Sequence, residues 1–268
     1  AMHRALRLTI DSAALVHNWR WLQERAGVPA GAAVKADGYG LGARETMRAL
    51  YEAGCHDFFV STWAEAEELG GVPKDASLVV LHGVGADDVE AALASTARPV
   101  LNSVEQVERW KEIGSGRPCD VMIDTGMNRL GLRPDEIACV DGLAIDTLHS
   151  HLACADEDHA LNGKQLQRFR EVPSVVPAKR YSFANSAGIC LGRDYSFDLV
   201  RPGLSLYGGI PRAEAKDHIR QAVRIEAQVV EGLGDVDERG ATAGDDALLD
   251  RGAGGRDRVL EAVLLLLE

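Results

Sequence analysis

The sequence predicts an α/β fold, a (β/α)8 barrel built from eight parallel strands. Short apolar or β-branched runs recur through the first four fifths of the 268-residue chain, each followed by a segment with apolar residues at helical spacing. Most steps between these runs are long enough to contain a crossover helix, which parallel strands require. Eight such units in roughly 210 residues favour a TIM-type barrel over a doubly wound open sheet, which gives a similar alternation.

The elements follow in order from the N-terminus. Asp11 is expected to cap a first helix over residues 14–25, because a carboxylate at this position accepts hydrogen bonds from backbone N–H groups. We expect strands at residues 32–35, 58–61, 78–81, 99–102, 120–124, 145–149, 180–183 and 198–201. Between them, the apolar spacing predicts helices at residues 43–53, 63–69, 87–94, 104–113, 135–140 and 162–170.

The character of the sequence changes from about Gln221. Residues 231–268 contain no aromatic residue and no lysine, and they are rich in Gly, Ala, Asp and Arg. They show no strand alternation before a final apolar run, where we expect a terminal helix at residues 259–267. The chain therefore divides into a barrel domain, residues 6–220, and a divergent C-terminal tail, residues 221–268.

Composition and charge exclude several classes of protein. The chain is 46% hydrophobic and 26% charged, as soluble globular proteins are, and its net charge of -12 disfavours broad binding to nucleic acid or acidic membranes. It has no apolar run near the ~20 residues of a membrane span and no signal-peptide core, so we expect a cytoplasmic protein. The five cysteines are widely spaced, which predicts reduced thiols and no metal site.

A lysine lies at the end of the first predicted strand, and parallel barrels gather their chemistry at the C-terminal ends of strands. Lys35 is followed by a glycine-flanked turn that contains Tyr39. A lysine amine among apolar side chains can lose its proton and form a Schiff base with a carbonyl group. Taken alone, such a lysine is more often a surface residue whose stem packs on apolar atoms.

The later strand ends add groups that bind anions and move protons. Arg129 can pair with a carboxylate, and either His149 or His151 can transfer a proton or hold a neighbour by hydrogen bonds. Small residues around Ser186 and Gly203 leave backbone N–H groups accessible to an anion, where barrels often bind phosphate. An amine at the end of the first strand and an anion-binding site at the ends of the last two strands together suit a phosphorylated aldehyde cofactor. Its phosphate would be anchored at the anion site, and its aldehyde would be linked to the amine through an imine.

The segments at these strand ends are AVKADGYGLGA, DTGMNRLGL, SHLACADE, FANSAG and DLVRPGLSLYG. In this order and at similar spacing, they resemble the motifs of the alanine racemase family. Residues 221–230, QAVRIEAQVV, resemble the strand that enters the second, mainly β domain of that family. The resemblance implies a fold type III pyridoxal phosphate enzyme that interconverts L-alanine and D-alanine for peptidoglycan synthesis, as a homodimer in the cytoplasm.

The resemblance also implies a role for each candidate residue. Lys35 would form the Schiff base with pyridoxal 5'-phosphate and act as one of two acid/base groups on the substrate Cα. Arg201 would face the pyridine nitrogen, and His151 would hydrogen-bond near it. Arg129 would lie beside the cofactor's phenolic oxygen and the substrate carboxylate. The remaining cofactor-binding residues would be Tyr39, Asn185, Ser186, Gly203 and Leu204.

Two positions depart from the family pattern. Met122 stands where many members carry a carbamylated lysine that supports the arginine equated with Arg129. No tyrosine follows Tyr207, whereas the family donates its opposite-face tyrosine from the β domain across a dimer interface. A truncated gene, a frameshift or an incomplete chain would each leave such a tail. Because the opposite face of Cα would lack its acid/base group, we expect impaired racemase activity in this chain. The alternatives are a non-catalytic pyridoxal phosphate barrel of the cofactor-homeostasis type and a fold type III enzyme that acts on one face of Cα.

Overall fold

The computed structural model describes residues 6–227. The described residues divide into two compact units, of which the larger is Ser12–Ala222. In the smaller unit, β1 (Leu6–Ile10) pairs in antiparallel fashion with β9 (Val223–Ala227). A strand is thus present within residues 221–230, as the resemblance implied, whereas β1 was not predicted. Residues 228–268, including the helix expected at 259–267, lie outside the described residues.

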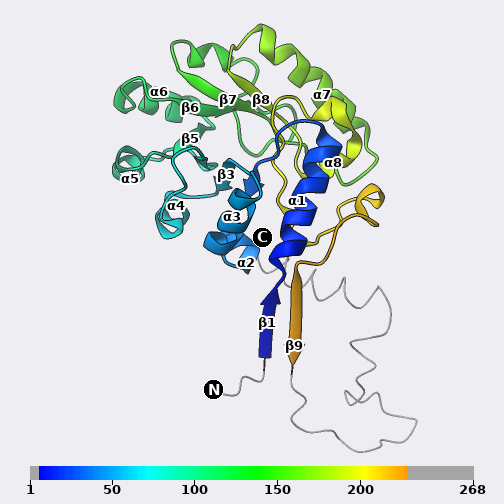
Figure 1. Ribbon diagram of the computed structural model, residues 1–268. Helices are drawn as coiled ribbons and strands as arrows, with labels where there is room; N and C mark the ends of the chain where they lie inside the picture. The colour runs from blue at the N-terminus through cyan, green and yellow to red at the C-terminus, as the bar shows by residue number, and fades with distance from the viewer. Residues whose placement is uncertain (1–5, 228–268) are drawn as a thin grey trace, which may run out of the picture. The chain divides into compact units, whose positions relative to one another are not determined.

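The larger unit is built on a sheet of seven parallel strands that follow one another in chain order (Figure 1). Each step is a crossover to the neighbouring strand, as the sequence predicted for a parallel barrel. The strands are β2 (Ala32–Ala33), β3 (Asp57–Val60), β4 (Ser77–Val80), β5 (Arg98–Leu101), β6 (Cys119–Met122), β7 (Ile145–His149) and β8 (Arg180–Ser182).

The eighth predicted strand, residues 198–201, closes the curled sheet without forming a regular ladder. Leu199 makes a parallel bridge to Ser182 of β8, and Val200 makes one to Ala30, which precedes β2. The segment is therefore hydrogen-bonded to both edges of the sheet, and the (β/α)8 prediction is confirmed. The strand itself was predicted too long, because Pro202 has no N–H group to extend the ladder.

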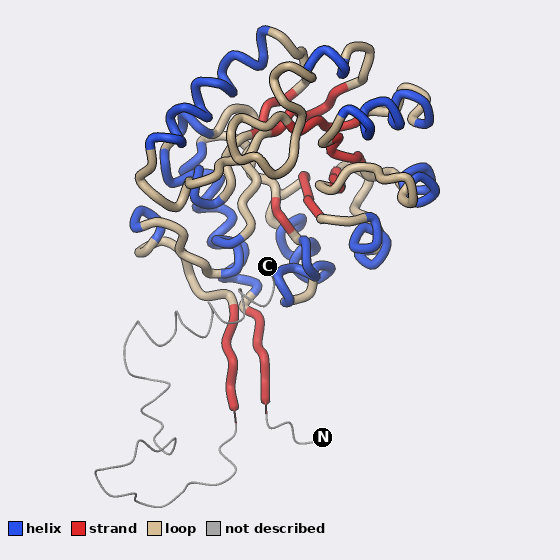
Figure 2. Tube along the Cα trace, turned by 180° about the vertical axis from the view of Figure 1, so that it is seen from behind, coloured by secondary structure: helices blue, strands red, loops and turns tan. Residues whose placement is uncertain are grey.

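Helices surround the strands (Figure 2). α4 and α6 begin where Thr62 and Ser103 accept hydrogen bonds from the backbone N–H groups three residues later, which satisfies donors that a helix start leaves unpaired. The helices are α1 (Ser12–Ala26), α2 (Lys35–Gly40), α3 (Ala43–Glu52), α4 (Trp63–Leu69), α5 (Val89–Ala94), α6 (Val104–Ile113), α7 (Ala160–Glu171) and α8 (Ser186–Leu191). Single 3-10 turns occupy Ile137–Val140, Val172–Ser174, Arg193–Tyr195, Leu204–Tyr207 and Ala213–Ala215.

Two helix predictions differ from the structure. The helix expected at residues 135–140 is only the 3-10 turn Ile137–Val140. Asp141 is already extended, with a φ of -56° and a ψ of 135°, so the segment leaves the helical conformation after one turn. The helix α8 was not predicted, since its residues were interpreted only as a small-residue anion cradle.

The barrel interior is filled by one apolar side chain from most of its strands, as in other closed parallel barrels. These side chains form one buried cluster of Ala33, Phe59, Val79, Val100, Met122 and Leu199. Such a layer leaves no channel, so the space for chemistry lies above it, at the C-terminal ends of the strands.

An ion-pair network closes the opposite end of the barrel. Its members are the first or second residues of their strands, so they share the N-terminal edge. Arg98 Nε donates to Asp120 Oδ1 over 2.9 Å, and Arg180 contacts Asp57 and Asp146 over 2.9 and 3.1 Å. Burial acts to raise the pKa of Asp57, but hydrogen bonding and attraction from Arg180 outweigh it and hold this pKa below its usual value. The network fixes the strands on which the site is built.

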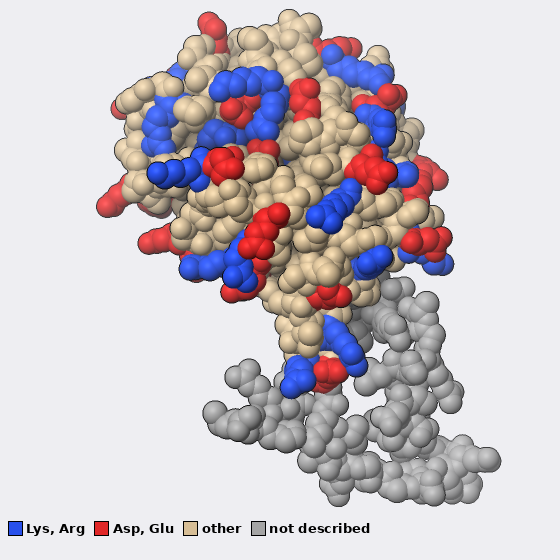
Figure 3. All heavy atoms as spheres, viewed as in Figure 1, with Lys and Arg blue, Asp and Glu red and all other residues tan. Residues whose placement is uncertain are grey.

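Acidic and basic side chains are interspersed on the face shown in Figure 3. None of the helices within residues 6–227 is long and apolar enough to cross a membrane. In the same part of the chain, no group of three His, Cys, Asp or Glu side chains is placed to hold a metal ion. All five cysteines have free thiols.

Candidate active site

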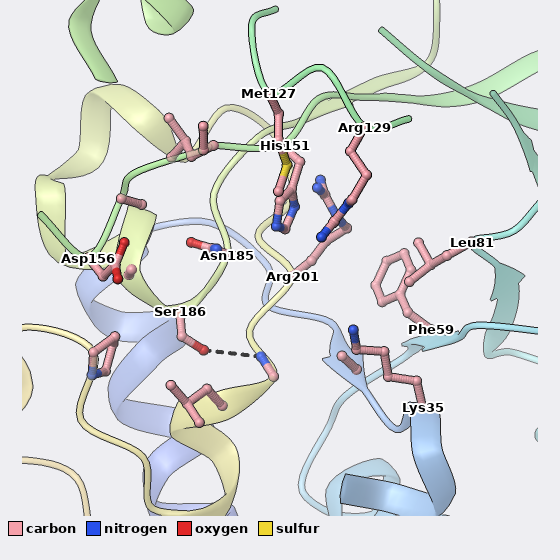
Figure 4. Close-up of a pocket in the computed structure, with 18 of the residues that line it drawn as sticks. Lys35, Phe59, Leu81, Met127, Arg129, His151, Asp156, Asn185, Ser186 and Arg201 are labelled. Atoms are coloured by element: carbon pink, nitrogen blue, oxygen red, sulfur yellow. Dashed lines mark hydrogen bonds between the residues drawn. The ribbon is translucent and has the colours of Figure 1, made fainter. Parts of the chain in front are cut away.

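A cavity of about 400 Å³ opens at the C-terminal ends of the strands (Figure 4). All nine residues to which the resemblance assigns a role line it, although they come from loops after four different strands and from the closing segment. They are Lys35, Tyr39, Arg129, His151, Asn185, Ser186, Arg201, Gly203 and Leu204. The fold therefore brings the whole predicted set into one pocket.

Lys35 enters the pocket from a left-handed turn. Ala36, Asp37, Gly38 and Tyr39 have φ values of 51°, 50°, 63° and 57°, so α2 is left-handed over these residues. Each non-glycine residue in this conformation costs roughly 1–2 kcal/mol, so such a turn persists only where its surroundings hold it. Two backbone hydrogen bonds close it, from Gly38 N to Val34 O over 2.9 Å and from Gly42 N to Asp37 O over 2.8 Å.

The turn aims Tyr39 at the glycine of the closing segment. A Cβ added to Gly203 would collide with the Tyr39 hydroxyl, so this close approach requires glycine. The Tyr39 ring also lies 4.7 Å from that of Tyr207, whose hydroxyl donates to Ala33 O over 2.9 Å. Burial raises the pKa of Tyr39 to about 12, so its phenol stays protonated and can donate a hydrogen bond.

Ser186 anchors the other side of the pocket. Its hydroxyl accepts hydrogen bonds from Gly203 N over 3.1 Å and from Ser205 N over 3.2 Å, which joins the start of α8 to the closing segment. Asn185 caps α8, because its side-chain oxygen accepts from Gly188 N over 2.9 Å. Because a hydroxyl that accepts two bonds still carries one O–H donor, Ser186 can donate a hydrogen bond to a ligand in the pocket that it lines.

Arg201 supplies a buried positive charge. Its guanidinium donates to the Ser182 hydroxyl over 2.6 Å and to Ser150 O over 2.7 Å, both of which are neutral oxygens. Burial lowers its pKa to about 10, so the side chain remains charged at neutral pH. These two hydrogen bonds fix the guanidinium in place. Because their acceptors are neutral, its positive charge is not cancelled by them and can attract a ligand.

The two histidines after β7 have different surroundings. His149 is fully buried, and its Nε2 lies 2.9 Å from Asp120 Oδ2, beneath the pocket. His151 lines the pocket, and its pKa is lowered to about 3, first by burial and then by the positive charges of Arg201 and Arg129. Its imidazole is therefore neutral at pH 7, which favours hydrogen bonding over proton storage.

The charges that line the pocket suit an anion. Lys35, Arg129 and Arg201 face it with Asp156 as the one acidic residue, within a chain whose net charge is -12. Figure 4 shows the lysine and both arginines directed into the same part of the cavity. Because a concave site concentrates the field of its charges, this lining attracts phosphates and carboxylates.

Comparison with known proteins identifies the family. The family model for the N-terminal domain of alanine racemase matches residues 10–211. The chain belongs to the alanine racemase family. Alanine racemase of Rhizobium meliloti is 42% identical over 240 residues, which cover 84% of this chain and 62% of that protein. Alanine racemase of Methylobacterium nodulans is 41% identical over 253 residues, which cover 90% and 68%.

A solved structure agrees with this assignment. A crystal structure of alanine racemase from Bartonella henselae with covalently bound pyridoxal phosphate matches with a TM-score of 0.82 at 36% identity. The match covers 87% of this chain and 72% of that one. The match to the Rhizobium meliloti relative is shorter, since this chain spans only 62% of the length of that protein.

The structure also places residues that the sequence did not nominate. Phe59, Leu81 and Met122 also line the pocket, and Figure 4 shows Asp156 on the opposite side of it from Phe59 and Leu81. Met122 puts a thioether into the pocket lining and supplies no anionic group there. Asp156 lies within the alanine racemase motif SHLACADE, which was a signal that could have found it.

Gln165 was missed because nothing in a single sequence marks it. It is fully buried on α7, and its amide donates to Thr125 Oγ1 over 3.1 Å and to His151 O over 2.9 Å. Its carbonyl accepts from Ala153 N over 2.9 Å. This side chain ties the loops after β6 and β7 together, and these loops carry Arg129 and His151.

Proposed function

We propose that this chain is the cofactor-binding barrel of an alanine racemase that uses pyridoxal 5'-phosphate, bound as a Schiff base to Lys35. The observation that carries the proposal is the single pocket lined by all nine nominated residues, with three cationic side chains against one acidic one. The family assignment and the covalently bound cofactor in the Bartonella henselae relative support it.

The residues present fit such a cofactor at both of its ends. The Tyr39 hydroxyl occupies the position that a side chain at residue 203 would fill, and the Tyr39 and Ser186 hydroxyls can both donate to a phosphate. Arg201 is held by neutral oxygens, so its remaining N–H groups can face the uncharged acceptor of a pyridine ring. Lys35 supplies the amine between these two ends.

When bound, pyridoxal phosphate withdraws electrons from the Cα–H bond of the amino acid, which makes this proton easier to remove. Lys35 would take or return the proton on its own side of Cα. Arg201, permanently charged, would keep the pyridine nitrogen from gaining a proton, because two adjacent positive charges repel. Arg129 would hold the substrate carboxylate, and neutral His151 would hydrogen-bond near Arg201.

Racemisation needs a second acid/base group on the opposite face of Cα, which Lys35 cannot reach. We propose that the enzyme works as a homodimer whose partner subunit contributes that group, with alanine as substrate. We further propose that residues 6–220 form the cofactor-binding domain and residues 221–268 a separate region. Five free thiols support a reducing compartment, the cytoplasm, where D-alanine would supply peptidoglycan synthesis.

Absorbance tests the cofactor proposal. The full chain mixed with pyridoxal phosphate should develop the visible band of cofactor attached to a lysine, and Lys35→Ala should abolish it. Lys164→Ala, at a lysine on α7 outside the pocket lining, is the matched control and should leave the band unchanged. An undiminished band in Lys35→Ala would remove Lys35 from its role.

Proton NMR of alanine in D2O separates the racemase from its alternatives. A racemase exchanges the Cα proton of L-alanine for deuterium and produces D-alanine. An enzyme that acts on one face would exchange the proton and retain the L configuration. A barrel that only binds the cofactor would do neither, which would overturn the proposed activity while leaving the cofactor site intact.

A further inference from the structure

We infer that Glu65 is a positioning residue that holds Lys35 in place through the left-handed turn; this inference rests on the proposed function of Lys35. Glu65 is the third residue of α4, and its carboxylate reaches the peptide that joins Lys35 to the turn. Glu65 Oε1 accepts a hydrogen bond from Ala36 N over 3.0 Å. Ala36 is the first left-handed residue, with a φ of 51°.

The second carboxylate oxygen fixes Glu65 to the neighbouring strand. Glu65 Oε2 accepts from Ser61 N over 2.6 Å, immediately after β3, and Glu65 N donates to Thr62 Oγ1 over 3.3 Å. Both oxygens of one carboxylate thus accept from backbone N–H groups, each at the end of a different strand. This requires an acid, because a glutamine amide has only one accepting oxygen and its NH2 group would face the other N–H.

Glu65 acts on the pocket only through the backbone. It does not line the cavity that holds Lys35, but a separate cavity of about 240 Å³ behind the turn, together with Asp37 and Arg44. The left-handed conformation is unfavourable for Ala36, Asp37 and Tyr39, so the bond to the first peptide of the turn adds to the two backbone bonds that hold it. When this bond is lost, Lys35 should leave its place in the pocket for part of the time.

Gln106 provides an internal comparison, because α6 uses the same device away from the candidate residues. Gln106 is the third residue of α6, and its N–H group donates to the capping residue Ser103 over 3.3 Å. Its side chain accepts from Asn102 N over 2.9 Å and donates to His82 O over 3.0 Å, which joins the loops after β5 and β4. None of the nine candidate residues lies in these loops.

The test compares two changes of one atom, Glu65→Gln and Gln106→Glu, in the full chain. Each keeps the size of the side chain and turns one of its two strand-end hydrogen bonds into a repulsive contact. The rate at which pyridoxal phosphate attaches to Lys35, followed by visible absorbance, should fall about tenfold in Glu65→Gln, as loss of one hydrogen bond to a charged group predicts. It should change less than about twofold in Gln106→Glu.

A rescue experiment separates positioning from general stability. Glycine adopts the left-handed conformation without the steric cost that alanine has. Ala36→Gly combined with Glu65→Gln should therefore recover most of the attachment rate, while Ala36→Gly alone should attach the cofactor at the rate of the unmodified chain. The thermal unfolding midpoints of Glu65→Gln and Gln106→Glu, measured without cofactor, should agree within a few degrees.

Three outcomes would overturn the inference: an unchanged rate in Glu65→Gln, an equal loss in Gln106→Glu, or no recovery with Ala36→Gly. Loss of folding confined to Glu65→Gln would also contradict a role limited to the turn. Each of these leaves the proposed cofactor site standing, provided that the unmodified chain attaches the cofactor and Lys35→Ala does not. Failure of the unmodified chain to attach it would instead refute the proposed function, and this inference with it.

Discussion

Gly203→Ala should weaken cofactor binding through a collision inside the pocket. The added Cβ would meet the Tyr39 hydroxyl, and it would lie 3.0 Å from Tyr39 Cζ and 3.2 Å from Ala33 Cβ. Forcing a methyl group into such a space costs typically about 1–3 kcal/mol. If Tyr39 moves aside and no longer reaches the phosphate, the dissociation constant of pyridoxal phosphate should rise about 5- to 150-fold.

The same substitution elsewhere in the barrel provides a control of opposite sign. Gly163 lies within α7, and a Cβ added there would meet no atom within 4 Å. Gly163→Ala should stabilise the helix by about 0.5–1 kcal/mol and raise the thermal midpoint by about 1–4 °C. Gly203→Ala should lower the midpoint by about 2–10 °C. Calorimetry and an absorbance titration with the cofactor measure both effects.

A double-mutant cycle with Tyr39→Phe identifies the collision itself. Phenylalanine lacks the hydroxyl that the new Cβ would strike, so Gly203→Ala should destabilise the chain less when residue 39 is Phe, by about 1 kcal/mol. Additive effects on the unfolding free energy would refute the reasoning. So would a Gly203→Ala protein that binds the cofactor as tightly as the unmodified chain.

Three further predictions follow from the buried charges. Arg201→Lys should weaken cofactor binding about tenfold in an absorbance titration, because one ammonium group cannot span Ser182 and Ser150 as the guanidinium does. Undiminished affinity for the cofactor would contradict this role of the guanidinium. Asp120→Asn should lower the unfolding free energy, measured in urea, by about 3 kcal/mol, because Arg98 and His149 lose the carboxylate that they share. A change below about 1 kcal/mol would mean that the ion-pair network adds little to the stability of the barrel. In ¹³C-histidine NMR of the cofactor-free chain, His149 and His151 should stay neutral down to about pH 5, since their pKa values are lowered to about 4 and about 3. A titration of His151 near pH 6.5, the ordinary value for histidine, would contradict its burial.

Acid should unfold the barrel through the network at its N-terminal edge. The pKa values of Asp57 and Asp146 are lowered in the folded state, because attraction from arginine outweighs the effect of burial. A carboxyl with a depressed folded pKa contributes its full stability above its unfolded pKa, about 3.9, and loses it as the pH falls through the folded value. The unfolding free energy should therefore change little from these groups above about pH 5 and fall below about pH 4, as urea titrations at each pH would show.

Much of the site followed from residue order along the chain. The alternation of strands and helices predicted the barrel, and a parallel barrel brings its strand ends to one mouth, so Lys35, Arg129 and Arg201 had to converge. The prediction needed no knowledge of distances. It extended to Ser186 and Gly203, because small residues at the last two strands are where a backbone can approach an anion.

The handedness of the turn after Lys35 was beyond the sequence pattern. Gly38 and Gly40 marked a turn, but Ala36, Asp37 and Tyr39 have no intrinsic preference for positive φ. One bond that supports the conformation is donated by Ala36 N to Glu65, which is 29 residues away along the chain. Gln165 was unpredictable for the same reason, since its partners become neighbours only after the barrel closes.

Borohydride reduction followed by peptide mapping tests the central claim most directly. Reduction should fix pyridoxal phosphate irreversibly on the lysine to which it is attached, and mass spectrometry of the digest then identifies that lysine. The account predicts one modified site, Lys35, within the segment AVKADGYG, and no stoichiometric modification in Lys35→Ala. Stoichiometric modification at Lys164, Lys179 or another lysine, with Lys35 left unmodified, would contradict it.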